Sequence, residues 1–286
     1  MYETFYGLKE KPFALVPDAS YLYLSEGHAK ALTLLRYSVI GRQGFTVITG
    51  EIGSGKTTLI NRLLDGLDED ITVGLLNFTE PGAAELNEWI AMAFGLEHRG
   101  KSRVELYEDF IAFLIDQYAQ GKHTVLIVDE AQNLIISGLE KVRMLSNVNA
   151  EKDYLLHLIL VGQPQLRSLL ASPQLEQLAQ RVSVSYHLDK LAAKDTKAYI
   201  LHRLGVAGAT ERLFSPQALR IIAEASGGVP RVINTLCDLA LVYGYSSGKR
   251  LVDARIAKAV LADREQMGLH GNRPSPVHSI ATTPTS

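Results

Sequence analysis

The residues best suited to chemistry form a glycine-rich segment near the start of the chain. It reads Gly50-Glu-Ile-Gly-Ser-Gly-Lys56-Thr57 and fits the pattern G-x-x-x-x-G-K-[ST] at every fixed position. In such a loop the backbone N–H groups converge on phosphate oxygens, the lysine adds a positive charge, and the threonine hydroxyl is offered to Mg²⁺. The segment therefore predicts a phosphate-binding loop. Its predicted binding residues are Gly50, Gly53, Ser54, Gly55, Lys56, Thr57 and Thr58.

An acidic pair follows an aliphatic run further along the chain. Asp129 comes directly after Val125-Leu-Ile-Val, and Glu130 follows it. At the end of a buried parallel strand, Asp129 would point toward the phosphate loop and hold Mg²⁺ through water. Glu130 would polarise the attacking water. The pair favours P-loop NTPases with a catalytic glutamate over small GTPases and nucleotide kinases. Because the sequence has no Asn-Lys-x-Asp motif, adenine is favoured over guanine.

Three further polar residues are placed to act on bound phosphates. Gln163 follows the aliphatic residues 158–161, so we expect it near the γ-phosphate or the attacking water. Arg181 precedes a predicted strand and could reach the γ-phosphate of a neighbouring subunit. Arg231 opens a predicted helix and could reach back to the phosphates. From spacing alone, a polar turn for Gln163 and solvated or salt-bridged positions for both arginines remain open. With Lys56 and Glu130, the residues Gln163 and Arg181 form the predicted catalytic set.

Short aliphatic runs alternate with helical patterns around these residues. The predicted strands span residues 45–49, 71–76, 124–128, 155–161 and 182–187. The predicted helices of this part span residues 56–64, 84–94, 104–120 and 136–147. Beyond Leu188 only helices are predicted, at residues 192–204, 215–226, 230–243 and 251–264. Continuous aliphatic strands separated by helices indicate an α/β fold whose parallel sheet is covered on both faces.

Four regions are predicted along the chain. Residues 1–40 are expected to form a lead and a helix that pack on the nucleotide site, and residues 41–189 an αβα core. Residues 190–266 are expected to form a small helical lid. Residues 267–286 are rich in Ser, Thr and Pro and are expected to be disordered.

Charge is unevenly distributed along a chain whose net charge is −2. Residues 190–264 contain 12 Lys and Arg against 6 Asp and Glu, whereas residues 1–189 contain 16 against 24. The basic part could serve head-to-tail self-association or a nucleic-acid surface, or be a solvated face only. The sequence shows no apolar run of the roughly 18 residues of a membrane span and no signal peptide, so a cytoplasmic protein is expected.

As a set, these motifs resemble the AAA+ ATPases, and in particular the ExeA-like group of general secretion pathway protein A. This group includes related ATPases of exosortase and polysaccharide-export loci, and it is similar to the TniB-type transposition ATPases. The resemblance covers about residues 1–262 and is carried by residues 2–28, 49–58, 129–133, 162–166, 180–182 and 227–237. It implies an AAA+ three-layer core with a parallel sheet, followed by a small α-helical lid domain.

The resemblance also implies roles for individual residues. Gln163 matches the sensor-1 position, Arg181 the arginine finger and Arg231 the sensor-2 position, and the lead would wrap the adenine side of the site. His28 matches a position of the family, but nothing in the sequence specifies its chemistry.

The implied function is Mg-ATP hydrolysis with nucleotide-dependent homo-oligomerisation, in the service of protein secretion or of polysaccharide or envelope export. Secretion-pathway members continue into a membrane span and a periplasmic part that this sequence lacks. We therefore expect a cytoplasmic protein that reaches the inner membrane only through a protein partner. Two alternatives remain: a DNA-binding ATPase of the transposition-targeting type, which the basic C-terminal part supports, and a nucleotide-gated binding module with slow turnover.

Overall fold

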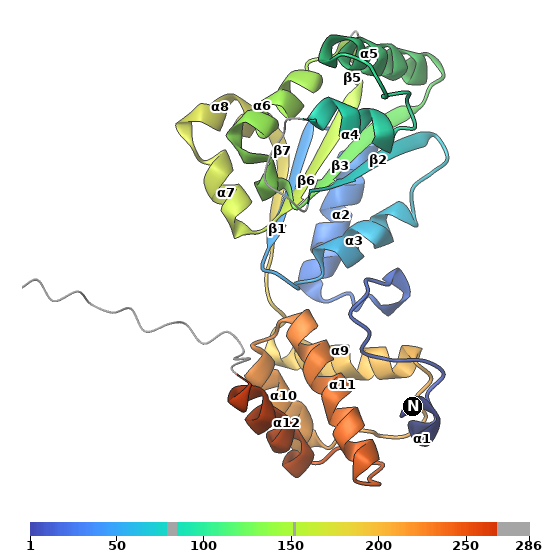
Figure 1. The fold of residues 1–286 in the computed structure, drawn as a ribbon, viewed down its shortest axis with the longest axis vertical. Coiled ribbons are helices and arrows are strands. Elements are labelled where there is room, and N and C mark those ends of the chain that lie inside the picture. The colour runs from blue at the N-terminus through green and yellow to red at the C-terminus, as the bar shows by residue number, and fades with distance from the viewer. Residues whose placement is uncertain (79–84, 151–152, 268–286) are drawn as a thin grey trace, which may run out of the picture. The chain divides into compact units, whose positions relative to one another are not determined.

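The structure, a computed structural model, describes residues 1–78, 85–150 and 153–267. The chain divides into two compact units (Figure 1). The sheet unit is Val16–Lys190, and the helical unit joins Met1–Leu15 to the chain from Leu191 onward. The predicted lead is therefore divided, because its first part belongs to the helical unit and its helix to the sheet unit. Of the predicted disordered tail, residues 268–286 lie outside the described residues.

A five-stranded sheet forms the centre of the sheet unit. Its strands are β1 Phe45–Gly50, β2 Ile71–Asn77, β3 His123–Asp129, β6 Leu156–Gly162 and β7 Val182–Leu188. They lie in the order β2-β3-β6-β1-β7, and every pairing is parallel. The predicted strands and the parallel sheet are confirmed. Since all carboxyl ends share one edge, the ends of β3, β6 and β7 lie beside the loop that follows β1.

Helices cover both faces of this sheet (Figure 1). On one face are α2 Glu26–Ile40 and α3 Lys56–Leu64. On the other are α4 Leu86–Ala93, α5 Arg103–Ala119, α6 Ile135–Leu145, α7 Pro164–Leu170 and α8 Glu176–Ala179. Strand residues alternate between the two cores: Val125 and Ile127 pack with α2 and α3, and Leu126 and Val128 with the opposite helices. This accounts for the continuous aliphatic runs of the sequence.

Shorter elements complete the sheet unit. Among the described residues they are three 3₁₀ turns, Ala19–Tyr21, Ala131–Leu134 and Pro173–Leu175, and an antiparallel pair of short strands, β4 Asn149–Ala150 and β5 Asp153–Tyr154. The sequence analysis missed this strand pair and α7, because elements of two and seven residues are too short to show a period. Longer helices start at clear signals, such as the capping box of Ser102 and Glu105 before α5.

The helical unit consists of α1 Glu3–Tyr6, α9 Ala193–Val206, α10 Pro216–Ser226, α11 Pro230–Ser246 and α12 Ala254–Gln266. The four predicted helices of this part are confirmed. The first residues of the chain are bonded to these helices. Tyr6 donates its hydroxyl hydrogen to the Leu241 carbonyl at 3.0 Å, and the buried Arg203 donates from Nε to the Pro12 carbonyl at 2.6 Å.

Gly228, between α10 and α11, has no room for a side chain. Its φ is +76°, and a Cβ would lie 2.0 Å from the Leu191 carbonyl oxygen. We expect Gly228→Ala to lower the free energy of unfolding by about 3 kcal/mol, because steric overlap adds to the cost of a left-handed alanine. Gly227→Ala is the matched control: its φ is +56°, but nothing lies within 4 Å of its Cβ. Urea unfolding followed by circular dichroism measures both, and equal losses would contradict the steric explanation.

His157 on β6 belongs to a buried polar cluster at the amino-terminal edge of the sheet. Its Nε2 lies 3.4 Å from Ser38 Oγ and 3.5 Å from Thr46 Oγ1, and its Nδ1 donates to the Gln43 carbonyl. Burial lowers the pKa of His157 from 6.5 to about 3, and the nearby His123 ring acts in the same direction. The folded protein therefore holds this imidazole in its neutral form.

This depressed pKa makes stability depend on pH. Below pH 6.5 the unfolded chain takes up a proton at His157, whereas the folded chain does so only near pH 3. Stability should therefore fall as the pH decreases through this window, by about 2 kcal/mol between pH 7 and pH 5 from this group. His157→Gln should make urea unfolding measurably less dependent on pH. The other histidines are present in both proteins, so unchanged pH dependence in the variant would disprove the assignment.

Candidate nucleotide-binding site

The predicted phosphate loop joins β1 to α3 at the carboxyl edge of the sheet. Gly53 and Gly55 adopt φ angles of +76° and +98°, which glycine reaches without strain. Lys56 is buried, and its Nζ donates to the carbonyl oxygens of Gly50 at 2.9 Å and Glu51 at 3.1 Å. The loop thus curls around its own lysine, whose ammonium donates to two backbone carbonyl oxygens of the loop.

The electrostatics of the loop suit an anion. Burial lowers the pKa of Lys56, an effect that the carboxylates of Glu130, Asp129 and Glu51 oppose. A bound phosphate would add negative charge next to the ammonium and offset the cost of its burial. The start of α3 contributes its positive dipole end at the same place.

The hydroxyl group of Ser54 indicates whether a phosphate fits this loop. Within the described part of the chain, its Oγ is buried and has no hydrogen-bond partner. It lies above Gly50, where a Cβ would come within 2.8 Å of it. A buried hydroxyl without a partner is unfavourable, so the loop has a free donor that phosphate oxygens would satisfy. The residues present therefore fit a nucleotide phosphate chain.

Thr57 and Asp129 meet beside the loop. Thr57 Oγ1 donates to Asp129 Oδ2 at 2.9 Å, and the backbone N–H of Glu130 donates to Asp129 Oδ1 at 2.9 Å. Asp129 is buried at the end of β3. A hydroxyl and a carboxylate at this spacing offer oxygen ligands of the kind that Mg²⁺ prefers, with phosphate oxygens and water completing its shell.

Glu130 is held by two glutamines. Its Oε2 accepts from Gln163 Nε2 at 3.0 Å and from Gln132 Nε2 at 2.5 Å, and the Gln163 N–H donates to Gln132 Oε1 at 3.0 Å. Glu130 itself has a φ of 54°, a left-handed conformation that costs about 1 kcal/mol and turns the chain sharply after β3. The carboxylate is thereby fixed between the ends of β3 and β6.

Gln132 is a site residue that the sequence analysis missed. It links Glu130 to the backbone of Gln163, and it lies so close to Gly162 that a Cβ there would come within 2.7 Å of its Oε1. The sequence feature that could have identified it is a polar residue two positions after Glu130. In the structure it lies between Ala131 and Leu134, which are both buried.

Arg181 lies away from this cluster within the sheet unit. Arg181 immediately precedes β7, whose register pairs Val182 with Phe45 at one edge and Leu188 with Gly50 at the other. A strand of this length spans about 20 Å, so Arg181 is too far from its own phosphate loop. Its Nη1 donates to Ser146 Oγ at 3.2 Å. Arg231 is exposed in the first turn of α11, in the helical unit. The roles of both arginines stay predictions.

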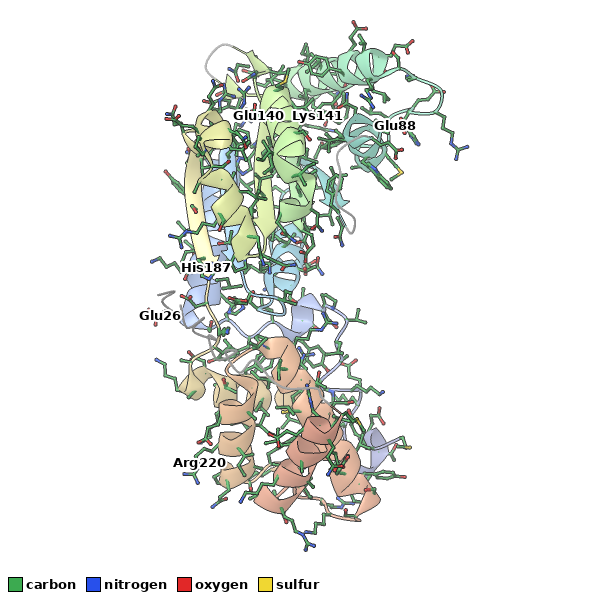
Figure 2. The ribbon with its side chains drawn as sticks, turned by 60° about the vertical axis from the view of Figure 1, so that its left-hand side comes forward. Glu26, Glu88, Glu140, Lys141, His187 and Arg220 are labelled. Atoms are coloured by element: carbon green, nitrogen blue, oxygen red, sulfur yellow. The ribbon has the colours of Figure 1, made fainter. Side chains whose placement is uncertain are left out.

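Other side chains mark the loop edge of the sheet unit. Glu26 at the start of α2 and His187 near the end of β7 both lie at this edge (Figure 2). Thr49, the residue before the loop, is 2.9 Å from His187 through Thr49 Oγ1 and His187 Nδ1. The loop is therefore bordered by α2 and β7 as well as by β3 and β6.

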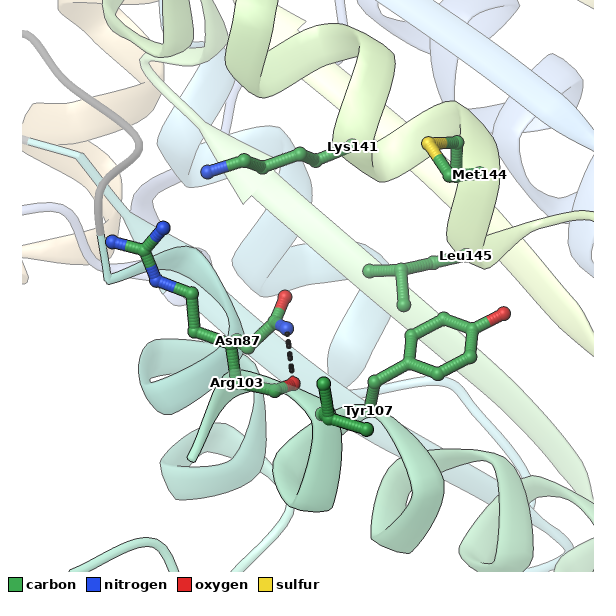
Figure 3. Close-up of a pocket in the computed structure, with 7 residues that line it drawn as sticks. Asn87, Arg103, Tyr107, Lys141, Met144 and Leu145 are labelled. Carbon is green, nitrogen blue, oxygen red and sulfur yellow. Dashed lines mark hydrogen bonds between the residues drawn. The ribbon is translucent and has the colours of Figure 1, made fainter. Parts of the chain in front are cut away.

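A separate cavity of about 400 Å³ lies between α4, α5 and α6 (Figure 3). Its lining is mostly apolar and consists of Asn87, Arg103, Val104, Tyr107, Lys141, Met144 and Leu145. None of the predicted site residues contributes to it. Nearby, α4 buries Leu86, Ile90 and Ala91 and leaves Trp89 46% exposed.

Comparison with known proteins agrees with this geometry. Residues 39–170 match the AAA domain family. The chain is 39% identical over 253 residues to general secretion pathway protein A of Aeromonas hydrophila. The aligned region covers 88% of this chain and 46% of that protein. The chain thus spans about half the length of this curated relative. Among the described helices, none is long and apolar enough to cross a bilayer.

Solved structures share the fold at low sequence identity. The ORC2 protein of Aeropyrum pernix, in ADPNP and ADP complexes, matches with a TM-score of 0.68 at 17% identity, over 89% of this chain and 72% of that one. Cdc6p of Pyrobaculum aerophilum matches with a TM-score of 0.64 at 18% identity, over 84% of this chain and 67% of that one. These structures show the fold; the match to the AAA domain family and the relative at 39% identity, together with the phosphate loop and the acidic pair, identify the chain as a member of the AAA+ family of P-loop ATPases, in the group related to general secretion pathway protein A.

Proposed function

We propose that the chain hydrolyses Mg-ATP at the carboxyl edge of its sheet. Lys56 and the loop N–H groups bind the phosphates, and Thr57 and Asp129 hold Mg²⁺, which neutralises charge on the phosphate oxygens when bound. Glu130 accepts the proton of a water molecule as its oxygen bonds to the γ-phosphorus, and the bond to the β-phosphate oxygen breaks to leave ADP and phosphate. Gln163 orients Glu130 and the water.

One observation carries this proposal: the Glu130 carboxylate is fixed by Gln163 beside the hydrogen-bonded pair of Thr57 and Asp129. A general base must lie within hydrogen-bond reach of the water that it activates. Here Asp129 with Glu130, Gln163, and the phosphate loop with Thr57 follow the ends of three neighbouring strands, β3, β6 and β1, so the sheet holds them in register.

The position of Arg181 supports the homo-oligomerisation that we propose. Its distance from its own phosphate loop means that an arginine finger at this position serves the nucleotide of another copy. Arg231 would sense the nucleotide from the helical unit. The role of the lead at the adenine stays a prediction, and its two parts belong to different units: residues 1–15 to the helical unit and residues 16–40 to the sheet unit.

The biological setting that we propose is protein secretion or polysaccharide and envelope export. The support is the 39% identity to general secretion pathway protein A over most of this chain. The ATPase would act with an envelope or export-system protein, which would bring it to the inner membrane from the cytoplasm. Only about half of that relative is matched, so the remainder of its length has no counterpart among these residues.

A DNA-dependent ATPase is the second candidate, and the charge of the helical unit favours it. Residues 190–264 contain 12 Lys and Arg against 6 Asp and Glu. Such an excess on one unit is the electrostatic feature expected of a surface that binds phosphate backbones.

ATP turnover measured against protein concentration, with and without duplex DNA, decides between these proposals. A specific activity that rises with protein concentration and is the same with and without DNA supports the oligomeric secretion-type ATPase. Strong stimulation by DNA, lost at high salt, would replace it with the DNA-dependent reading. No turnover under either condition, with Mg-ATP bound, would leave a nucleotide-gated binding module.

A further inference from the structure

His28 reaches the phosphate loop from α2. The residue is 3% exposed, and its Nε2 lies 3.1 Å from the carbonyl oxygen of Ser54 within the loop. Its Nδ1 lies 2.7 Å from Ser25 Oγ. A carbonyl oxygen only accepts, so Nε2 carries the hydrogen and Nδ1 accepts from the Ser25 hydroxyl. Burial lowers the pKa of His28 and so favours this neutral form.

The topology brings His28 to this place. The 15 residues of α2 span about 22 Å, which matches the length of the strands beside it. The C-terminal end of α2 leads into β1 at the amino-terminal edge of the sheet. The N-terminal end of α2 therefore lies at the opposite, carboxyl edge, where the phosphate loop is. Ser25 caps this start, accepting the His28 N–H at 3.3 Å. The cap therefore fixes both the first turn of α2 and the orientation of the imidazole.

The bond to Ser54 also fixes the next N–H group. In a planar trans peptide the C=O and the N–H point in opposite directions. With the Ser54 carbonyl held by His28, the N–H of Gly55 must point away from His28. Gly55 has a φ of +98°, and a Cβ on it would lie 3.1 Å from His28 Nε2. This peptide borders a glycine, whose backbone rotates more freely than any other, so an external bond is needed to hold it.

We propose that His28 is a positioning residue of the phosphate loop, which holds the Ser54–Gly55 peptide so that the Gly55 N–H faces the bound phosphates. The inference rests on the proposed function, because it concerns the same site. His28 acts through the backbone and touches neither nucleotide nor water. Its loss should therefore weaken nucleotide binding and raise KM, and leave kcat at saturating Mg-ATP nearly unchanged.

The test is calorimetric titration of the full chain with Mg-ADP, beside ATP turnover. His28→Leu keeps the volume and removes both bonds, and His28→Asn is polar but too short to reach Ser54. Each should raise Kd and KM about tenfold, the value of one well-placed hydrogen bond to a charged group. His28→Gln retains an N–H donor at a similar reach and should recover most of this loss. Ser38→Ala, a buried polar change on the same helix, should leave Kd unchanged.

Lys56→Ala separates this inference from the proposed function. If the native chain does not bind Mg-ADP, the proposed function fails, and the inference with it. If the native chain binds and Lys56→Ala does not, the site is established. In that case native affinity in His28→Leu or His28→Asn would overturn the role of His28. Equal weakening in His28→Gln and His28→Leu would also overturn it, because it would indicate packing alone.

Discussion

Replacing Glu130 by glutamine should lower ATP turnover by at least about a hundredfold and leave nucleotide binding intact. Glutamine has the size of glutamate and stays between Gln163 and Gln132, but it cannot accept the proton of the attacking water. Lys56, Thr57 and the loop N–H groups are unchanged, so Mg-ATP should remain bound. Steady-state phosphate release gives the turnover, and titration with Mg-ATP gives the affinity.

Glu88→Gln is the matched control for this prediction. Glu88 projects from α4, away from the loop edge of the sheet (Figure 2). The same charge change there should leave turnover within about twofold, as expected for a surface substitution away from the site. If Glu130→Gln keeps more than a third of the native turnover, another group activates the water and the assignment of Glu130 is wrong.

Removing the guanidinium of Arg181 should lower turnover about a thousandfold, and mixing should reverse part of the loss. Arg181→Ala chains keep a complete phosphate site, whereas Glu130→Gln chains keep the arginine. In an equal mixture about a quarter of head-to-tail interfaces pair the intact site with the intact arginine. The mixture should therefore recover about a quarter of the native turnover, although each variant alone is inactive.

Arg220→Ala controls for the loss of one positive charge. Arg220 lies on the surface of α10 in the helical unit (Figure 2) and should have no effect on turnover without DNA. A mixture of Arg181→Ala and Glu130→Gln that stays inactive would show that the arginine acts within its own chain or not at all. Turnover of the native chain independent of its concentration would contradict the oligomer on which this prediction rests.

Most of the fold can be predicted from the sequence, because the patterns that identify its strands and helices involve residues close together in the chain. Aliphatic runs identify the five strands, and Ser215 with Pro216 marks the start of α10. The phosphate loop and the acidic pair are equally local, since the glycines and Lys56 are adjacent and Asp129 ends a strand. The predicted meeting of Thr57 with the Asp129 strand end appears in the structure as one hydrogen bond.

The missed contributions depend on contacts between distant residues. His28 acts on Ser54 from 26 positions away, and Gln132 reaches Gln163 across 31 positions. Neither side chain belongs to a pattern with a fixed spacing, so one sequence gives no reason to pair them. The division of the lead has the same cause, because the bond from Arg203 that ties Pro12 to α9 spans 191 positions.

In the proposed oligomer, the strand β7 of each subunit would connect its own nucleotide site to that of the neighbouring copy. At one end its Leu188 carbonyl lies against Gly50 of the phosphate loop, and at the other end stands Arg181. A shift of the loop when phosphate leaves would move the first end of β7 and displace Arg181, the arginine that we propose for the neighbouring copy. ATP hydrolysis at one site would then control hydrolysis at the neighbouring site, and the subunits would hydrolyse ATP sequentially.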